Sequence, residues 1–115
     1  TPAGRWGPVG SMAIQPFILA QKEQVANLCR RARARRLDVF GSAVRDDFSE
    51  ATSDLDFLVE FEAVPPKDYA QSYFDLKEGL EHLFHRPVDL LTPAGLKNPY
   101  LRARVEAERQ VVYAA

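Results

Sequence analysis

The chain has 115 residues, of which 46% are hydrophobic and 27% charged, a composition typical of one globular domain. No apolar run approaches the roughly 20 residues that a membrane-spanning helix needs, and we expect no secretory signal peptide. The single cysteine, Cys29, cannot form an internal disulfide, which fits a reducing, cytoplasmic compartment.

The net charge of −1 hides a strongly acidic centre. Residues 38–91 hold four basic and thirteen acidic side chains, a balance of −9, whereas residues 1–37 hold seven basic and one acidic. Such a centre argues against a nucleic-acid-binding surface there and suits a site for divalent cations.

Residues 1–11 precede the only methionine, Met12, and end in a Gly-Ser pair. A Gly-Ser pair before a methionine resembles the remnant of an expression tag. We therefore expect residues 12–115 to form the single domain of this chain.

Residues 14–36 are predicted to be a lead-in followed by a helix. One helical face carries four apolar side chains, Val25, Leu28, Cys29 and Ala32, so we expect Cys29 to be a buried core thiol. The end of this helix is predicted to carry five arginines: Arg30, Arg31, Arg33, Arg35 and Arg36. Cations at a helix C-terminus are often only solvated and partly paired. A patch that binds phosphate, nucleic acid or an acidic partner is the other interpretation.

A short strand is predicted at residues 37–40, followed by a turn at Gly41-Ser42, a short helix starting within 43–47 and a polar loop at 46–52. Gly41 has no Cβ, so a ligand can approach its backbone closely. The N–H groups of the turn, the Ser42 hydroxyl and the charge of Arg45 together suit an anion. The alternative is an ordinary turn in which Ser42 caps the helix.

The next predicted strand, residues 55–61, separates acidic from apolar side chains. Asp54 and Asp56 are two residues apart and therefore share one face. The opposite face is apolar throughout: Leu55, Phe57, Val59 and Phe61. Glu60 lies further along the acidic face and is interpreted as solvated.

Beyond a break at residues 64–66, the pattern predicts a helix at 67–84, a strand at 88–91, a loop at 92–99, a helix at 100–109 and a strand at 110–113. The helix at 67–84 carries an apolar stripe that we interpret as core, with Tyr69 and Tyr73 as candidates for a partner contact. The alternation of elements predicts an α+β (α/β) domain, a small mixed β-sheet with flanking helices.

Asp54, Asp56 and Asp89 all belong to otherwise apolar strands, where ionised carboxylates need a cation or strong donors. Three oxygen ligands without histidine or cysteine favour Mg²⁺ or Mn²⁺ over zinc. Such a set can hold two metal ions for phosphoryl or nucleotidyl transfer. The alternative is that Asp54 and Asp56 merely face solvent.

These motifs resemble a known family. Gly41-Ser42, eleven intervening residues and Asp54-Leu55-Asp56 look like the signature of the polymerase-beta-like nucleotidyltransferase superfamily, and the string Phe-Gly-Ser-Ala-x-Arg resembles its minimal members in bacteria and archaea. The setting of Val88-Asp89-Leu90 is similar to that of the family's third carboxylate. The resemblance covers residues 14–113 and departs at Asp38, where an apolar residue is more usual; we expect Asp38 to pair with a nearby arginine.

The resemblance implies transfer of AMP from ATP to a hydroxyl, with release of pyrophosphate. Asp54 and Asp56 would bind two metal ions that carry the triphosphate, and Asp89 would ligate the catalytic ion and help to activate the acceptor. Ser42 and the Gly41 backbone would hold the phosphates. Family members often pair with HEPN-domain toxins, to which they add AMP on a tyrosine and so act as antitoxins.

Chain length supplies a separate expectation about the acceptor. About 100 residues can form the catalytic core and little more, so a partner or a second subunit is expected to complete the acceptor site. Two alternatives remain open. One is a non-catalytic nucleotide-binding antitoxin that neutralises its partner by contact, and the other is an adenylyltransferase for a small hydroxyl compound such as an aminoglycoside.

Overall fold

The structure is a computed structural model that describes residues 14–44 and 54–115, with the backbone alone at Ser42. The elements follow one another as α1 (Pro16–Leu19), α2 (Lys22–Ala32), β1 (Ala34–Phe40), η2 (Gly41–Val44), β2 (Leu55–Phe61), α3 (Pro66–Phe84), β3 (Val88–Leu91), η3 (Pro93–Gly95), α4 (Pro99–Glu108) and β4 (Gln110–Ala114). The predicted tag remnant 1–11, Arg45 and the loop 46–52 lie outside the described residues.

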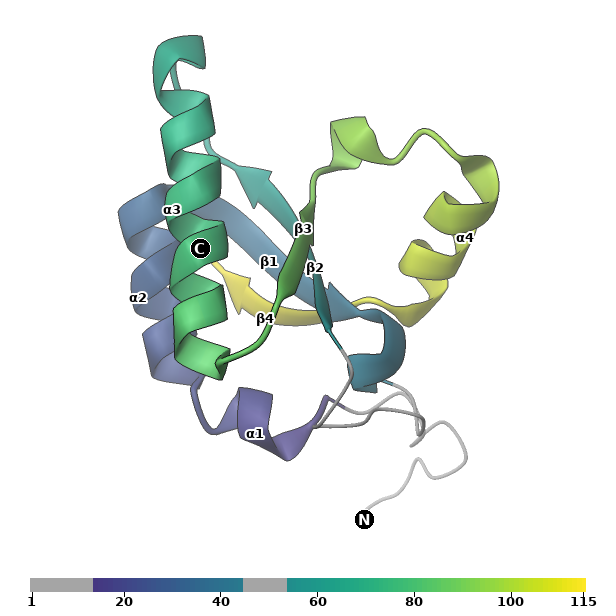
Figure 1. The fold of residues 1–115 in the computed structure, drawn as a ribbon. Coiled ribbons are helices and arrows are strands. Elements are labelled where there is room, and N and C mark those ends of the chain that lie inside the picture. Colours follow the sequence, from purple (N-terminus) through teal and green to yellow (C-terminus); the bar gives the residue numbers. More distant parts are fainter. Residues whose placement is uncertain (1–13, 45–53) are drawn as a thin grey trace.

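A four-stranded mixed sheet forms the centre of the fold, with strand order β3-β2-β1-β4 (Figure 1). β1 pairs antiparallel with β2 and with β4, whereas β2 and β3 run parallel. The parallel pair requires a long crossover, which α3 provides. The predicted fold class, a small mixed sheet with flanking helices, is confirmed.

One face of the sheet packs against α2 and α3 and holds the main core (Figure 1). The alternation predicted for residues 55–61 is confirmed, since Leu55, Phe57 and Val59 are fully buried on this face. Cys29 of α2 belongs to the same core, and its burial raises the pKa of the thiol to about 12. Cys29 is therefore a core thiol, as predicted.

The helices α2 and α3 approach each other closely at Gly79. A Cβ at this position would lie 2.7 Å from Cδ2 of Leu28. A glycine in the middle of a helix costs about 1 kcal/mol relative to alanine, and here it allows the two helices to pack.

The opposite face is covered more thinly, by α4 and the segment that leads into it (Figure 1). A second cluster of four buried side chains lies there: Phe40, Leu58, Leu96 and Val105. Val105 is the single buried residue of α4. The charged and polar side chains of β1 and β2 lie on this thinly covered face.

The helix α2, which was predicted to extend to Arg36, ends earlier, at Ala32. Arg33 adopts a left-handed conformation, with φ of 63°, and its N–H bonds to the carbonyls of Arg30 and Cys29. The chain then enters β1 at Ala34, so Arg35 and Arg36 belong to a strand. The predicted cluster of five arginines at one helix end is therefore wrong, because a reversal without glycine divides it.

The long helix α3 has nearly the bounds that were predicted for it. It is terminated by His85, whose backbone is left-handed with φ of 56°. The Tyr73 hydroxyl donates to the carbonyl of Leu90, which ties Tyr73 to β3, whereas Tyr69 is 39% exposed. Of the two tyrosines proposed for partner contact, Tyr69 is the accessible one. Neither α3 nor any other helix within the described residues is both long and apolar enough to cross a membrane.

Candidate active site

Two of the predicted carboxylates lie side by side at the start of the parallel strands. Asp56 of β2 and Asp89 of β3 are register partners. Neighbouring strands are about 4.8 Å apart and partners share a face, so both side chains are on the thinly covered side of the sheet. Asp56 is half-buried and Asp89 is exposed. The sheet thus brings together two acids that are far apart in the sequence.

Gly41 completes this corner of the sheet. It follows Phe40, which is the β1 partner of Asp56. Gly41 has φ of +75°, and a Cβ there would lie 2.5 Å from Oδ2 of Asp56. Only glycine fits both the left-handed backbone and this close approach. The predicted turn therefore sits directly against the predicted acidic strand.

A cleft of about 220 Å³ opens beside these groups. The sheet and the turn contribute Phe40, Gly41, Asp56, Asp89 and Leu91, and α4 contributes Leu101, Arg104, Val105 and Glu108. The Gly41 N–H donates to Oε1 of Glu108 over 3.2 Å. A larger groove of about 670 Å³ runs between α2 and α3, but neither Asp56 nor Asp89 lines it. The chemistry therefore belongs to the smaller cleft.

The third predicted carboxylate, Asp54, directly precedes β2, is exposed and does not line the cleft. In residues 14–44 and 54–115, no three side chains of histidine, cysteine, aspartate or glutamate are close enough together to hold a metal ion. The three-carboxylate metal site thus stays a prediction, with Asp56 and Asp89 as the pair that the sheet aligns.

The residues that are present fit Mg²⁺ and a phosphate. Asp56 and Asp89 offer oxygen ligands only, and neither histidine nor cysteine lines the cleft. This donor set suits a hard divalent cation. At Gly41 the missing Cβ leaves room for the Asp56 carboxylate, which therefore lies beside a backbone N–H of the kind that binds anions.

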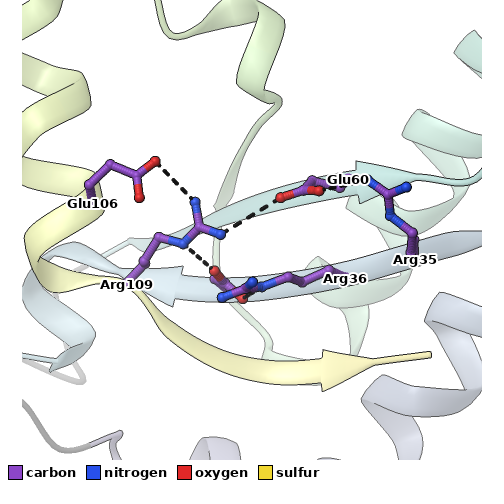
Figure 2. A network of polar contacts seen from close by, with 6 residues as sticks. Arg35, Arg36, Glu60, Glu106 and Arg109 are labelled. Atoms are coloured by element: carbon purple, nitrogen blue, oxygen red, sulfur yellow. Dashed lines mark hydrogen bonds and ion pairs between the residues drawn. The ribbon is translucent and has the colours of Figure 1, made fainter.

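A network of charged side chains surrounds the buried Asp38 next to the cleft, and Figure 2 shows how these side chains meet. Asp38 of β1 is 1% exposed; its Oδ1 accepts a hydrogen bond of 2.9 Å from Nε of Arg36. Its Oδ2 lies 2.6 Å from Nε of Arg109, a contact that is an ion pair without the alignment of a hydrogen bond. The predicted pairing of Asp38 with an arginine is confirmed. The hydrogen bond that Arg36 donates to Asp38 also raises the pKa of Arg36.

Glu60 belongs to the same network, so its interpretation as a solvated residue is wrong. Its side chain is 26% exposed. Oε1 of Glu60 lies 2.9 Å from Nη2 of Arg35, and Oε2 lies 3.7 Å from Nη2 of Arg109. Arg109 directly follows α4 and also contacts Glu106 at 3.3 Å. Through Arg109, the end of α4 is anchored to β1 and β2 (Figure 2).

Comparison with known proteins identifies the family. The model of a family described as "Nucleotidyltransferase domain" matches residues 22–112. The chain belongs to this nucleotidyltransferase family. The protein adenylyltransferase MntA of Thermococcus cleftensis is 35% identical over 100 residues, which cover 87% of this chain and 91% of that protein.

Solved structures agree with this assignment. A structure assigned as a minimal nucleotidyltransferase is 38% identical, with a TM-score of 0.68, and covers 88% of this chain and 98% of its own. A Shewanella oneidensis complex of a tri-AMPylated HEPN toxin with an MNT antitoxin is 16% identical, with a TM-score of 0.56, and covers 85% of this chain and 73% of its own. At this identity the second likeness concerns the fold.

Two polar residues of this nucleotidyltransferase's cleft, Arg104 and Glu108, were absent from the sequence prediction. The positions that line the cleft from α4 are spaced as i, i+3, i+4 and i+7, which is one helical face. That face mixes two apolar and two charged residues, so hydrophobic periodicity does not reveal it. The spacing alone was the available signal.

Proposed function

We propose that this nucleotidyltransferase transfers AMP from ATP to a tyrosine hydroxyl of a HEPN-type partner protein, in a reaction that needs a divalent metal. Two comparisons support the proposal. The relative from Thermococcus cleftensis is named a protein adenylyltransferase, and a structural neighbour is an MNT antitoxin in complex with an AMPylated HEPN toxin. In such a pair this chain is the antitoxin.

The observation that carries the proposal is the position of Asp56. Its carboxylate is next to Asp89 in the sheet register and directly against Gly41. The pair proposed to bind the metal and the turn proposed to bind phosphate therefore line one cleft. Nucleotidyl transfer requires both, because the triphosphate and its cation bind together.

When bound, Mg²⁺ or Mn²⁺ supplies positive charge that stabilises the attacking and the leaving oxygen. Asp56 and Asp89 would hold it, with Asp54 as the third ligand. The Gly41 N–H and the turn at Ser42 bind the β and γ phosphates, and Arg45 adds positive charge there. The roles of Asp54, Ser42 and Arg45 are part of the proposal.

The reaction balances with groups that this chain and its substrates supply. The acceptor oxygen forms a bond to the α-phosphorus of ATP, the bond from that phosphorus to the bridging oxygen breaks, and pyrophosphate leaves. Asp89, the more exposed of the two aligned carboxylates, would take the proton of the acceptor hydroxyl. Its exposure also allows a protein-borne tyrosine to reach it.

The test uses ATP labelled on the α-phosphate in one reaction and on the γ-phosphate in another. The chain is mixed with a candidate HEPN-type partner protein and Mg²⁺. We expect only the α-label to appear on the partner, and Asp56→Asn and Asp89→Asn to abolish it. Asp68→Asn removes an exposed carboxylate of α3 that does not line the cleft and serves as the matched control.

Transfer of the γ-label would contradict nucleotidyl transfer. Absence of any label while the partner is still inhibited would favour the contact-only antitoxin.

A further inference from the structure

The face of α4 that lines the cleft carries two charged side chains beside two apolar ones. The helix buries Val105 alone, and Arg104 and Glu108 reach the cleft on either side of it along the helix. Both side chains therefore stand where a nucleotide would enter between α4 and the sheet.

Glu108 makes a specific contact there. Its Oε1 accepts a hydrogen bond of 3.2 Å from the N–H of Gly41. The orientation of this N–H is well defined, because the left-handed backbone of Gly41 packs against the carboxylate of Asp56. A carboxylate oxygen on a fixed backbone donor has the charge and hydrogen-bonding capacity of a phosphate oxygen.

We propose that Glu108 is an internal competitor for the phosphate position: its carboxylate holds the Gly41 N–H, and a phosphate of the nucleotide displaces it. The inference rests on the proposed function, which places phosphates at this turn. It assigns a regulatory role to α4. The nucleotide binds only when the C-terminal turn of α4 releases Gly41.

Charge repulsion favours the displacement of Glu108 over an arrangement in which Glu108 and a phosphate occupy the cleft together. Asp56, Asp89 and Glu108 put three carboxylates around one cleft of about 220 Å³. A triphosphate adds further negative charge, and like charges repel at these distances. Glu108 is the one of the three that hydrogen-bonds the anion donor, so it is the one that must move.

Arg104 is positioned to pair with the Glu108 carboxylate once a phosphate has displaced it. It precedes Glu108 by four residues on the same helical face and forms no hydrogen bond or ion pair with any residue that the structure describes. Residues four apart on a helix are close enough to form an ion pair. A rotation of the Glu108 side chain toward Arg104 would free the Gly41 N–H without unfolding α4.

The experiment measures binding of tripolyphosphate, of a non-hydrolysable ATP analogue and of adenosine by calorimetry, with Mg²⁺ present. Glu108→Gln keeps the size of the side chain and removes its charge. We expect it to tighten binding of tripolyphosphate and of the ATP analogue about three- to tenfold, since a charged acceptor is replaced by a weaker neutral one. Binding of adenosine, which has no phosphate, is expected to stay the same.

The matched control is Glu106→Gln, which removes the same charge from the same helix. Glu106 is 60% exposed and contacts Arg109 instead of the cleft. It is expected to change affinity less than about twofold, because an exposed charge outside the cleft is screened. If Glu108→Gln fails to fold, Glu108→Asp replaces it. Its carboxylate is one methylene too short for the Gly41 N–H, and it is expected to shift binding in the same direction.

Equal or weaker binding of tripolyphosphate by Glu108→Gln would overturn the inference, because it would make Glu108 neutral or a contributor to binding. An equal gain with Glu106→Gln would also overturn it, since the cause would then be overall charge. If neither the wild type nor Glu108→Gln binds tripolyphosphate or the ATP analogue, both the inference and the proposed binding of a nucleotide are overturned. Failure of AMP transfer to the partner, with the gain in affinity intact, would refute the proposed function alone.

Discussion

Replacing Gly41 by alanine tests the contact on which the site is built. The new Cβ would lie 2.5 Å from Oδ2 and 3.3 Å from Cγ of Asp56, so the carboxylate has to turn away. The backbone φ of +75° adds about 1–2 kcal/mol for a residue with a Cβ. Together we expect a loss of about 2–4 kcal/mol in the free energy of unfolding and loss of AMP transfer.

Urea denaturation of paired variants separates the two causes. In an Asp56→Ala background the clash disappears, and the cost of Gly41→Ala is expected to fall to about 1–2 kcal/mol from the backbone alone. Gly95→Ala is the control: its Cβ would lie 3.6 Å from Oγ1 of Thr92, an ordinary contact, and its effect is expected to stay within about 0.5 kcal/mol. An equal cost of Gly41→Ala in both backgrounds would refute the argument that Asp56 packs on Gly41.

Three further predictions concern the rest of the fold. Asp38→Asn removes a buried charge from Arg109 and is expected to cost about 2–3 kcal/mol in urea denaturation; a change below about 0.5 kcal/mol would contradict the anchoring of α4. Cys29, with its pKa raised to about 12 by burial, is expected to resist a thiol reagent at pH 8 until the chain is denatured, and rapid native labelling would contradict its burial. The hydrogen bond from Lys77 lowers the pKa of Glu81 below its ordinary value of 4.5, so its stabilisation is present above that pH and is lost as the pH falls through the lowered pKa. The melting-temperature difference between the wild type and Glu81→Gln should therefore shrink as the pH falls below about 4.5, and a constant difference would argue against the pairing.

Much of the site could be predicted from local sequence. Alternation in residues 55–61 separated the acidic face from the apolar face, and the isolated acid in Val88-Asp89-Leu90 marked a second strand of the same kind. Gly41 followed a short apolar run, which is typical of a strand that ends in a tight turn. These signals span only a few residues each, so no tertiary information was needed to find them.

The features that the sequence did not predict depend on tertiary contacts. The end of α2 was misplaced because the left-handed residue is Arg33, whereas glycine is the usual signal for a helix to end. Glu60 was interpreted as solvated because its partners, Arg35 and Arg109, lie 25 and 49 positions away in the sequence and meet it only across the sheet. Glu108 was missed because its contact with Gly41 joins residues 67 positions apart.

The mass of the partner protein after incubation with the chain, ATP and Mg²⁺ tests the central claim most directly. We predict that the partner gains the mass of one or more AMP groups, that the modified peptide carries them on tyrosine, and that Asp89→Asn leaves the mass unchanged. A partner of unchanged mass after incubation with the wild-type chain, or one that gains a phosphate in place of AMP, would contradict the assignment of this chain as a protein adenylyltransferase.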